Sequence, residues 1–173
     1  MASNELNLCA CCARRGKTCC QDREIYLSPG DVARIIAHAG GEPFYEWALP
    51  RDPAYLAQDD DPVWQRHVFR RDGRRRTLRR KASGDCWFLG DAGCRLSMEI
   101  RPLVCRLHPF AYTADGIAAE TEKGCPENLL PPGANLISAL AMSGDAAARW
   151  HHMLYDEVIQ DEPDRGTDLR PAC

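Results

Sequence analysis

The residues with the clearest chemistry in this chain are cysteines, which form two groups far apart in the sequence. The chain has ten cysteines. Five of them lie between positions 9 and 20, and four more lie between positions 86 and 125. Thiolate side chains bind zinc ions and iron–sulfur clusters alike. We interpret the two groups as halves of one metal-binding core.

The N-terminal segment predicts the compartment in which these thiols act. It has neither the basic start nor the apolar stretch of a secretory signal. No apolar run in the chain approaches the ~18 residues of a membrane span, so we expect a cytoplasmic protein with no membrane partner. Because the cytosol keeps thiols reduced, clustered cysteines there more often bind metal or do redox chemistry than form disulfides.

The spacing of the first group is typical of a metal site. Cys9 and Cys12 are three positions apart, the common way for one turn to present two thiolates to one metal. Cys19 and Cys20 are adjacent, so their side chains point in different directions in most backbone conformations. We expect a loop here, because several thiols must converge on one point. One of the adjacent pair can then bind a second metal, pack, or serve another role.

The later cysteines carry their own flanking motifs. These motifs are Cys86-Trp87-Phe88-Leu89, Gly93-Cys94, Arg101-Pro102 followed by Cys105, and Gly124-Cys125-Pro126. In order and spacing, the chain from position 9 to 126 resembles the bacterial CxxCxxCC, or YkgJ-like, family of zinc- or iron-chelating cysteine-cluster proteins. A related cluster occurs in the flagellin lysine methylase. The chain departs from the compact pattern by six residues between Cys12 and Cys19 and by the extra Cys11.

The resemblance implies a set of eight metal ligands, which can supply two four-ligand sites. These ligands are Cys9, Cys12, Cys19, Cys20, Cys86, Cys94, Cys105 and Cys125. The family and the surplus of thiols over one zinc site favour an iron–sulfur cluster, with zinc as the alternative cofactor. Cys11 is either a ligand or a spare thiol, and Cys173 is expected to take no part. His108 is either a ligand or proton donor beside the metal, or a structural residue.

Basic residues follow the middle of the chain as one block. The block consists of Arg70, Arg71, Arg74, Arg75, Arg76, Arg79, Arg80 and Lys81. It is predicted on a hairpin, either as a solvated edge that resists edge pairing or as a docking surface for an acidic protein partner. Nucleic acid is the weaker candidate, because no aromatic residues interleave the arginines.

Local patterns predict the elements that position these residues. Ser28, Pro29 and Asp31 have the order of an N-cap, a first helical residue and a capping-box acid, so a helix is expected up to Gly40. Further helices are predicted at 43–49 and from 136 onward, where Ser143 is the N-cap that splits two segments. Strands are predicted at 24–27, 63–69 and 86–90, with hairpins or tight turns near 72–73, 91–93 and 115–116 and a turn at 124–126.

These elements predict an α+β fold, a small irregular metal-organised domain with short β-hairpins and a C-terminal helical segment. One domain is expected over 1–160, followed by a flexible polar tail at 161–173. The predicted function is a cytosolic metal-binding protein that holds an iron–sulfur cluster, either redox-active or assisting a modification reaction. The alternative is a structural zinc module that scaffolds protein interactions. No dinucleotide, P-loop or serine-nucleophile motif is found, so no catalytic residue is assigned and enzyme activity stays open.

Overall fold

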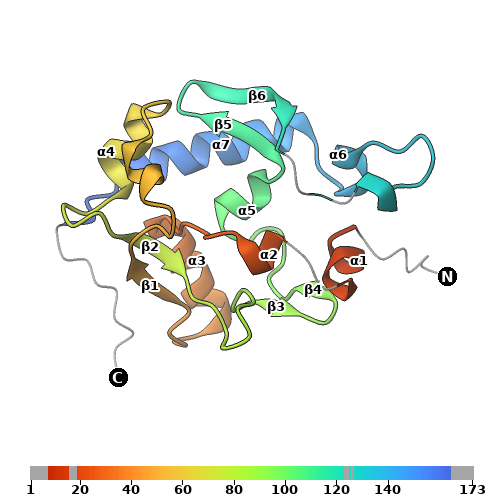
Figure 1. The fold of residues 1–173 in the computed structure, drawn as a ribbon, viewed down its shortest axis with the longest axis horizontal. Coiled ribbons are helices and arrows are strands. Elements are labelled where there is room, and N and C mark those ends of the chain that lie inside the picture. Colours follow the sequence, from red (N-terminus) through yellow and green to blue (C-terminus); the bar gives the residue numbers. More distant parts are fainter. Residues whose placement is uncertain (1–7, 16–18, 123–124, 126, 165–173) are drawn as a thin grey trace.

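The computed structural model describes residues 8–15, 19–122, 125 and 127–164, and its fold is α+β, as predicted (Figure 1). The helices are α1 (Leu8–Arg14), α2 (Cys19–Asp22), α3 (Pro29–Ala39), α4 (Pro62–Val68), α5 (Leu103–Leu107), α6 (Leu136–Ala139) and α7 (Gly144–Ile159), with 3-10 turns η1 (Pro53–Ala57) and η2 (Glu127–Leu129). The strands are β1 (Tyr45–Ala48), β2 (Arg75–Leu78), β3 (Leu89–Gly90), β4 (Gly93–Cys94), β5 (Phe110–Thr113) and β6 (Gly116–Thr121). They form three antiparallel pairs, β1–β2, β3–β4 and β5–β6.

Helix α3 begins with the predicted capping box. Ser28 Oγ accepts a hydrogen bond from Asp31 N at 3.0 Å, and Asp31 Oδ2 accepts one from Ser28 N at 3.2 Å. Gly40 follows the helix with a φ of 78°, a conformation that favours glycine. Asp31 Oδ1 also accepts a hydrogen bond from Leu103 N at 3.0 Å, so the same carboxylate connects α3 to α5.

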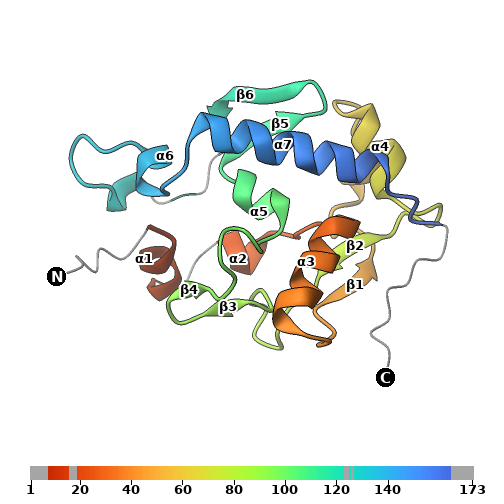
Figure 2. The same cartoon turned by 180° about the vertical axis from the view of Figure 1, so that it is seen from behind.

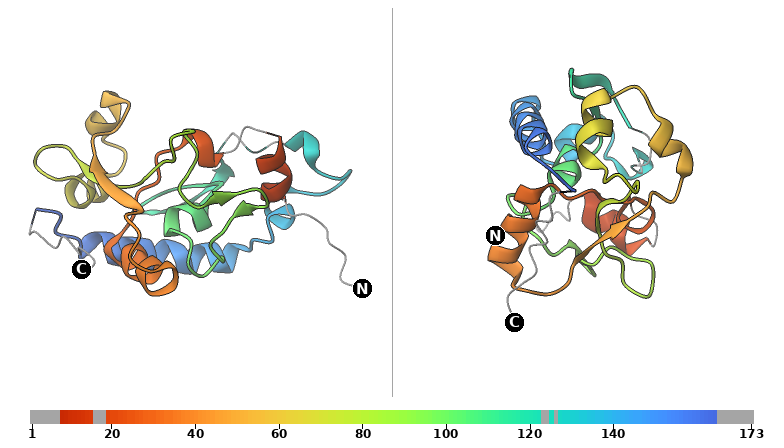
Figure 3. Two further views of the ribbon diagram at one scale, coloured as in Figure 1. Left: turned by 90° about the horizontal axis from the view of Figure 1, so that it is seen from below. Right: turned by 90° about the vertical axis from the view of Figure 1, so that its left-hand side faces the viewer.

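Helix α7 is the element against which much of the fold packs. It starts at the predicted N-cap, where Ser143 Oγ accepts a hydrogen bond from Ala146 N at 3.1 Å. It contacts α3, α4, α5 and β6. From behind, it passes in front of β5, with α5 below it (Figure 2), and from below it runs along one side of the molecule (Figure 3). Ala147 is buried on its packing face, and the neighbouring Ala148 is exposed.

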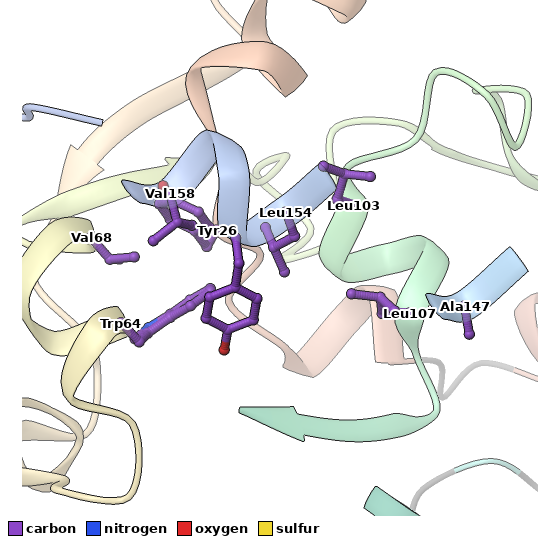
Figure 4. Close-up of a cluster of buried hydrophobic side chains, with 9 residues drawn as sticks. Tyr26, Trp64, Val68, Leu103, Leu107, Ala147, Leu154 and Val158 are labelled. Atoms are coloured by element: carbon purple, nitrogen blue, oxygen red, sulfur yellow. The ribbon is translucent and has the colours of Figure 1, made fainter. Parts of the chain in front are cut away.

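The side chains buried by α7 form the first of two apolar clusters (Figure 4). Its members are Tyr26, Trp64, Val68, Leu103, Leu107, Ala147, Leu154, Tyr155 and Val158. The second cluster consists of Leu27, Val32, Ile35, Phe44, Leu78, Cys86, Phe88, Leu89 and Leu96. Burying one large aliphatic or aromatic side chain contributes ~1.5–3 kcal/mol. Because Cys86 belongs to the second cluster, the cysteine site is built directly on apolar packing.

The strand predicted at 63–69 is wrong, because these residues form helix α4. Asp61 Oδ1 accepts a hydrogen bond from Trp64 N at 3.0 Å, and Pro62 takes the first helical position. An aspartate N-cap followed by proline is a strong helix start. This start outweighs the strand propensity of the valines and aromatic residues that follow it.

The helix predicted at 43–49 is also wrong, because this segment contains strand β1. Tyr45 lies opposite Leu78 and Ala48 opposite Arg75 in the β1–β2 pair. Cross-strand packing of this kind depends on a partner strand about thirty residues away in sequence, which local patterns do not reveal. The strand predicted at 24–27 is reduced to one isolated bridge between Tyr26 and Thr77.

Two predicted hairpins are present. The turn after β3 brings Cys94 opposite Leu89, and β5 and β6 pair around the predicted turn at 115–116. The turn at Gly73, with a φ of 80°, also forms, but it connects α4 to β2 and not two strands. Of the turn predicted at 124–126, only Cys125 lies among the described residues.

The basic block does not form one exposed face. Arg75 and Arg76 are only 5% and 4% exposed, whereas Arg71, Arg74 and Lys81 are exposed. The acidic partner predicted for this block stays a prediction. Asp161, assigned above to the start of the tail, is 3% exposed, and 165–173 lie outside the described residues. Within the described part of the chain, no helix combines the length and apolar character needed to span a bilayer.

Candidate metal centre

The first cysteine group lies on two short helices, and not in the predicted loop. Cys9 and Cys12 belong to α1, where residues three positions apart are neighbours on the helix surface. Cys19 and Cys20 open α2. A helical turn therefore brings Cys9 and Cys12 together as effectively as a loop would. Helix α1 packs against β4, which carries Cys94.

The cysteines that the family resemblance selects line one cavity of about 460 Å³, which we call the central cavity. Its cysteines are Cys9, Cys12, Cys19, Cys20, Cys86, Cys94, Cys105 and Cys125. Cys11 is half-buried and is not among the lining residues, and Cys173 lies outside the described part of the chain. None of the nine cysteines that the structure describes is in a disulfide. Four segments distant in sequence thus bring eight thiols to one space.

Four of these thiols, which we call the inner thiols, interact with one another. They are Cys20, Cys86, Cys94 and Cys105. Burial, with smaller contributions from Cys20 and Cys94, raises the pKa of Cys86 to about 11. Burial raises the pKa of Cys105 well above its ordinary value, and the other three inner thiols add to the effect. Like charges at close range repel in a desolvated site, so a cation is the natural partner for these sulfurs.

Three further thiols, Cys9, Cys12 and Cys125, form a second set that we call the outer thiols. Although Cys9 as a whole is exposed, desolvation by the surrounding protein raises the pKa of its thiol, and Cys20 and Cys12 contribute. Desolvation also raises the pKa of Cys125, with contributions from Cys9 and Cys12. Cys20 also raises the pKa of Cys9 and of Cys12, so the inner and outer sets interact electrostatically.

His108 completes the outer set. Its Nε2 lies 3.5 Å from Cys125 Sγ, and its Nδ1 lies 3.5 Å from Glu122 Oε2. Within the described residues, His108 Nδ1 has no partner that meets hydrogen-bond geometry. Glu122 also pairs with Arg23, and its contacts with His108 and Arg23 lower its pKa. Histidines that bind metals commonly have such a carboxylate on the ring nitrogen that faces away from the metal.

Basic side chains hold the backbone around the thiols. Arg80 donates hydrogen bonds to Gln21 O at 2.5 Å and Gly84 O at 2.8 Å, which connects α2 to the segment before Cys86. Arg101 donates from Nε to Leu96 O at 2.9 Å, and its charge lowers the pKa of Cys94 against the larger opposing effect of burial. These arginines were expected on a hairpin face or near the cysteines, and their contacts follow only from the tertiary structure.

The central cavity also has aromatic and basic lining residues that the sequence did not reveal. Tyr26, Tyr55, Trp64, Arg75 and Tyr112 line it, and they come from five separate segments. We call this part the aromatic end. No local motif links these residues, because their spacing in sequence follows no helical or strand period.

The donor types of the central cavity fit a metal or an iron–sulfur cluster, because thiolates and imidazole are established ligands for both. Among the residues that the structure describes, no three or more histidine, cysteine or acidic side chains are grouped closely enough to be assigned as one metal site. The fit therefore rests on donor chemistry, on the shared cavity and on the mutual interaction of the sulfurs. No family model, no curated protein and no solved structure matches the chain.

Proposed function

We propose that this chain is a cytoplasmic metal-binding protein of the cysteine-cluster type, and that its cysteines hold an iron–sulfur cluster. One observation carries the proposal: eight thiols from distant segments line a single cavity of about 460 Å³. Clustered thiols of a reducing compartment have metal binding as their usual role. A cation compensates the burial and the mutual repulsion that together raise their pKa values.

The inner thiols are the proposed cluster ligands. Cys20, Cys86, Cys94 and Cys105 supply the four thiolates that a cluster requires. Phe88, Leu89 and Leu96 are buried around them in the second apolar cluster. A cluster held there supplies one-electron redox chemistry, and the apolar surroundings and nearby N–H groups tune its potential. The chain's own contribution is to collect the thiolates, exclude water and place Arg101 beside Cys94.

The alternative is a zinc-binding module that scaffolds an interaction, and the outer thiols favour it. Cys9, Cys12 and Cys125 with His108 are a three-cysteine, one-histidine donor set, which is common in structural zinc sites. Glu122 beside His108 is the usual partner of a zinc-bound imidazole. Cys19, the remaining cysteine of the cavity, is the competing fourth ligand.

The test is elemental analysis of protein purified without oxygen. Iron with matching acid-labile sulfide and a broad absorbance near ~400 nm supports the cluster. Zinc in stoichiometric amount, without colour or sulfide, supports the scaffold alternative. Protein that is folded and contains neither metal would contradict both readings.

A further inference from the structure

The aromatic end contains two buried N–H groups without an acceptor. Arg75 is 5% exposed and Trp64 is 8% exposed, and both line the central cavity. Within the described residues, neither Arg75 Nε nor Trp64 Nε1 has a hydrogen-bond partner. Nearly all buried donors in native proteins are paired, and an unpaired one costs about 1–3 kcal/mol. Two such donors on one cavity indicate that an acceptor occupies it in the working protein.

The charge at this end indicates that the acceptor is an anion. The guanidinium of Arg75 lies 3.7 Å from Glu24 Oε2. The same Glu24 carboxylate faces Arg51 Nε at 3.8 Å and accepts a hydrogen bond from Arg51 N at 3.1 Å. At 3.7 Å, Glu24 lies beyond hydrogen-bond distance of the Arg75 guanidinium, so the buried positive charge of Arg75 is only loosely paired. Because the Arg75 side chain is nearly inaccessible to bulk water, that charge favours a bound anion strongly.

The rings at this end indicate that the anion has an apolar, planar body. Arg75 Cζ lies 4.4 Å from the centre of the Tyr55 ring, and the rings of Tyr26 and Trp64 meet edge to face at 4.9 Å. Aromatic surfaces of this kind prefer a stacked or edge-on ring partner over a small hydrated ion. Cavities of about 300–1,000 Å³ are typical of small-molecule sites, so the observed volume is sufficient.

Tyr112 links this end to the thiols. Burial raises the pKa of its phenol, and Tyr55, Glu122 and Cys105 contribute. Tyr112 lines the same cavity as Tyr55 and the inner thiol Cys105. A molecule held at the aromatic end shares a single cavity with whatever the thiols bind.

We propose that the aromatic end of the central cavity binds a small organic anion, with its carboxylate on Arg75 and Trp64 and its planar body against Tyr26 and Tyr55. This site goes beyond the proposed metal function. Its recognition groups are an arginine, an indole N–H and aromatic rings, none of which is a proposed metal ligand.

The test is isothermal titration of the full chain, purified without oxygen and with its metal content measured. Benzoate, benzamide, acetate and inorganic phosphate are the probes, at constant ionic strength. We expect benzoate to bind with one-to-one stoichiometry. Benzamide lacks the charge and acetate lacks the ring, so each is expected to bind at least ~10-fold more weakly. Equal affinity for benzoate and benzamide, equal affinity for benzoate and phosphate, or no binding of any probe would overturn the proposal.

Three variants assign the binding to these residues. Arg75→Gln should weaken benzoate at least ~10-fold, and Trp64→Phe, which keeps a ring but removes the N–H, should weaken it by about fivefold. Glu24→Gln removes the competing carboxylate and should tighten benzoate by about fivefold. The matched control is Arg74→Gln, since Arg74 is exposed, pairs with Asp72 at 3.3 Å and does not line the cavity.

Arg75→Gln should weaken benzoate binding, whereas Glu24→Gln should tighten it. A general loss of folding would weaken binding in both variants, so it cannot produce this pair of results. A purely structural Arg75 predicts that Glu24→Gln leaves benzoate binding unchanged or weaker, and either outcome would overturn the site. Metal content is measured on each variant. If a variant loses benzoate binding and keeps its metal, the effect of the substitution lies at the aromatic end. If the parent protein contains no metal, only the proposed metal function is contradicted, and the benzoate test still applies.

Discussion

Arg76 and Asp161 form a buried bidentate ion pair that joins β2 to the segment after α7. Arg76 donates from Nη1 to Asp161 Oδ2 at 2.7 Å and from Nη2 to Oδ1 at 2.9 Å. The side chains are 5% and 2% exposed. Tyr26 donates its hydroxyl to the same carboxylate at 3.1 Å. A residue of the basic block and a residue predicted in the tail thus pair with each other inside the fold.

Removing the anion of this pair should be strongly destabilising. Asp161→Ala leaves the Arg76 guanidinium buried without a counter-charge, and we expect the free energy of unfolding to fall by about 3–5 kcal/mol in urea denaturation at neutral pH. Asp164→Ala is the control, because Asp164 pairs with the exposed Arg71 at 3.8 Å and should change stability by less than about 1 kcal/mol. Similar small losses in both variants would contradict the buried pair.

The capping carboxylate of α3 gives a second stability prediction. Asp31 is buried and accepts hydrogen bonds from Ser28 N, Leu103 N and Arg34. Asp31→Ala therefore removes a cap and leaves buried donors unpaired, and we expect a loss of about 3 kcal/mol. Asp52→Ala removes an exposed cap with one backbone partner, Ala54 N at 2.9 Å, and should cost about 1 kcal/mol or less in the same assay. A smaller loss for Asp31 than for Asp52 would refute this assignment.

The proposed inner ligands predict that metal content and stability fall together. Cys86→Ser and Cys105→Ser should each lower bound metal. They should also lower the melting temperature by ~6 °C or more, the shift that a loss of about 3 kcal/mol produces in a chain of this size. Metal analysis and thermal unfolding of the same samples provide the measurement. Cys11→Ser is the matched control, since Cys11 does not line the central cavity, and Cys173→Ser should also be silent. Unchanged metal in both inner variants would rule out this ligand set.

His108 and Glu122 test the outer set separately. If His108 binds zinc, His108→Ala should lose one metal equivalent while the inner set keeps its own. Glu122→Gln should weaken zinc by about 10–100-fold, because the carboxylate orients and polarises the imidazole. His152→Ala serves as control, because His152 is exposed on α7. Full metal content in His108→Ala would mean that His108 is a structural residue, and Cys19 would then be the remaining candidate ligand in the cavity.

Local signals in the sequence predicted elements wherever neighbouring residues alone determine the backbone. The Ser28 and Ser143 caps and the turn before Gly116 are of this kind, since each depends on hydrogen bonds or dihedral angles within a few residues. The same logic was available at Asp61, where an N-cap followed by proline predicts the helix that forms. Strand β1 offered no such signal, because its conformation depends on pairing with β2.

The family resemblance, which depends on cysteine order and flanking motifs, selected the eight thiols that line the central cavity, and their role as metal ligands stays a prediction. The sequence by itself also determined the fold class. Only the tertiary structure decided which thiols interact, and that Arg75 and Arg76 lie inside rather than on a docking face. It alone brought five distant segments together as the aromatic end. The physical reason is that burial and electrostatic interaction depend on distances in space, which chain folding sets between residues that have no local pattern in common.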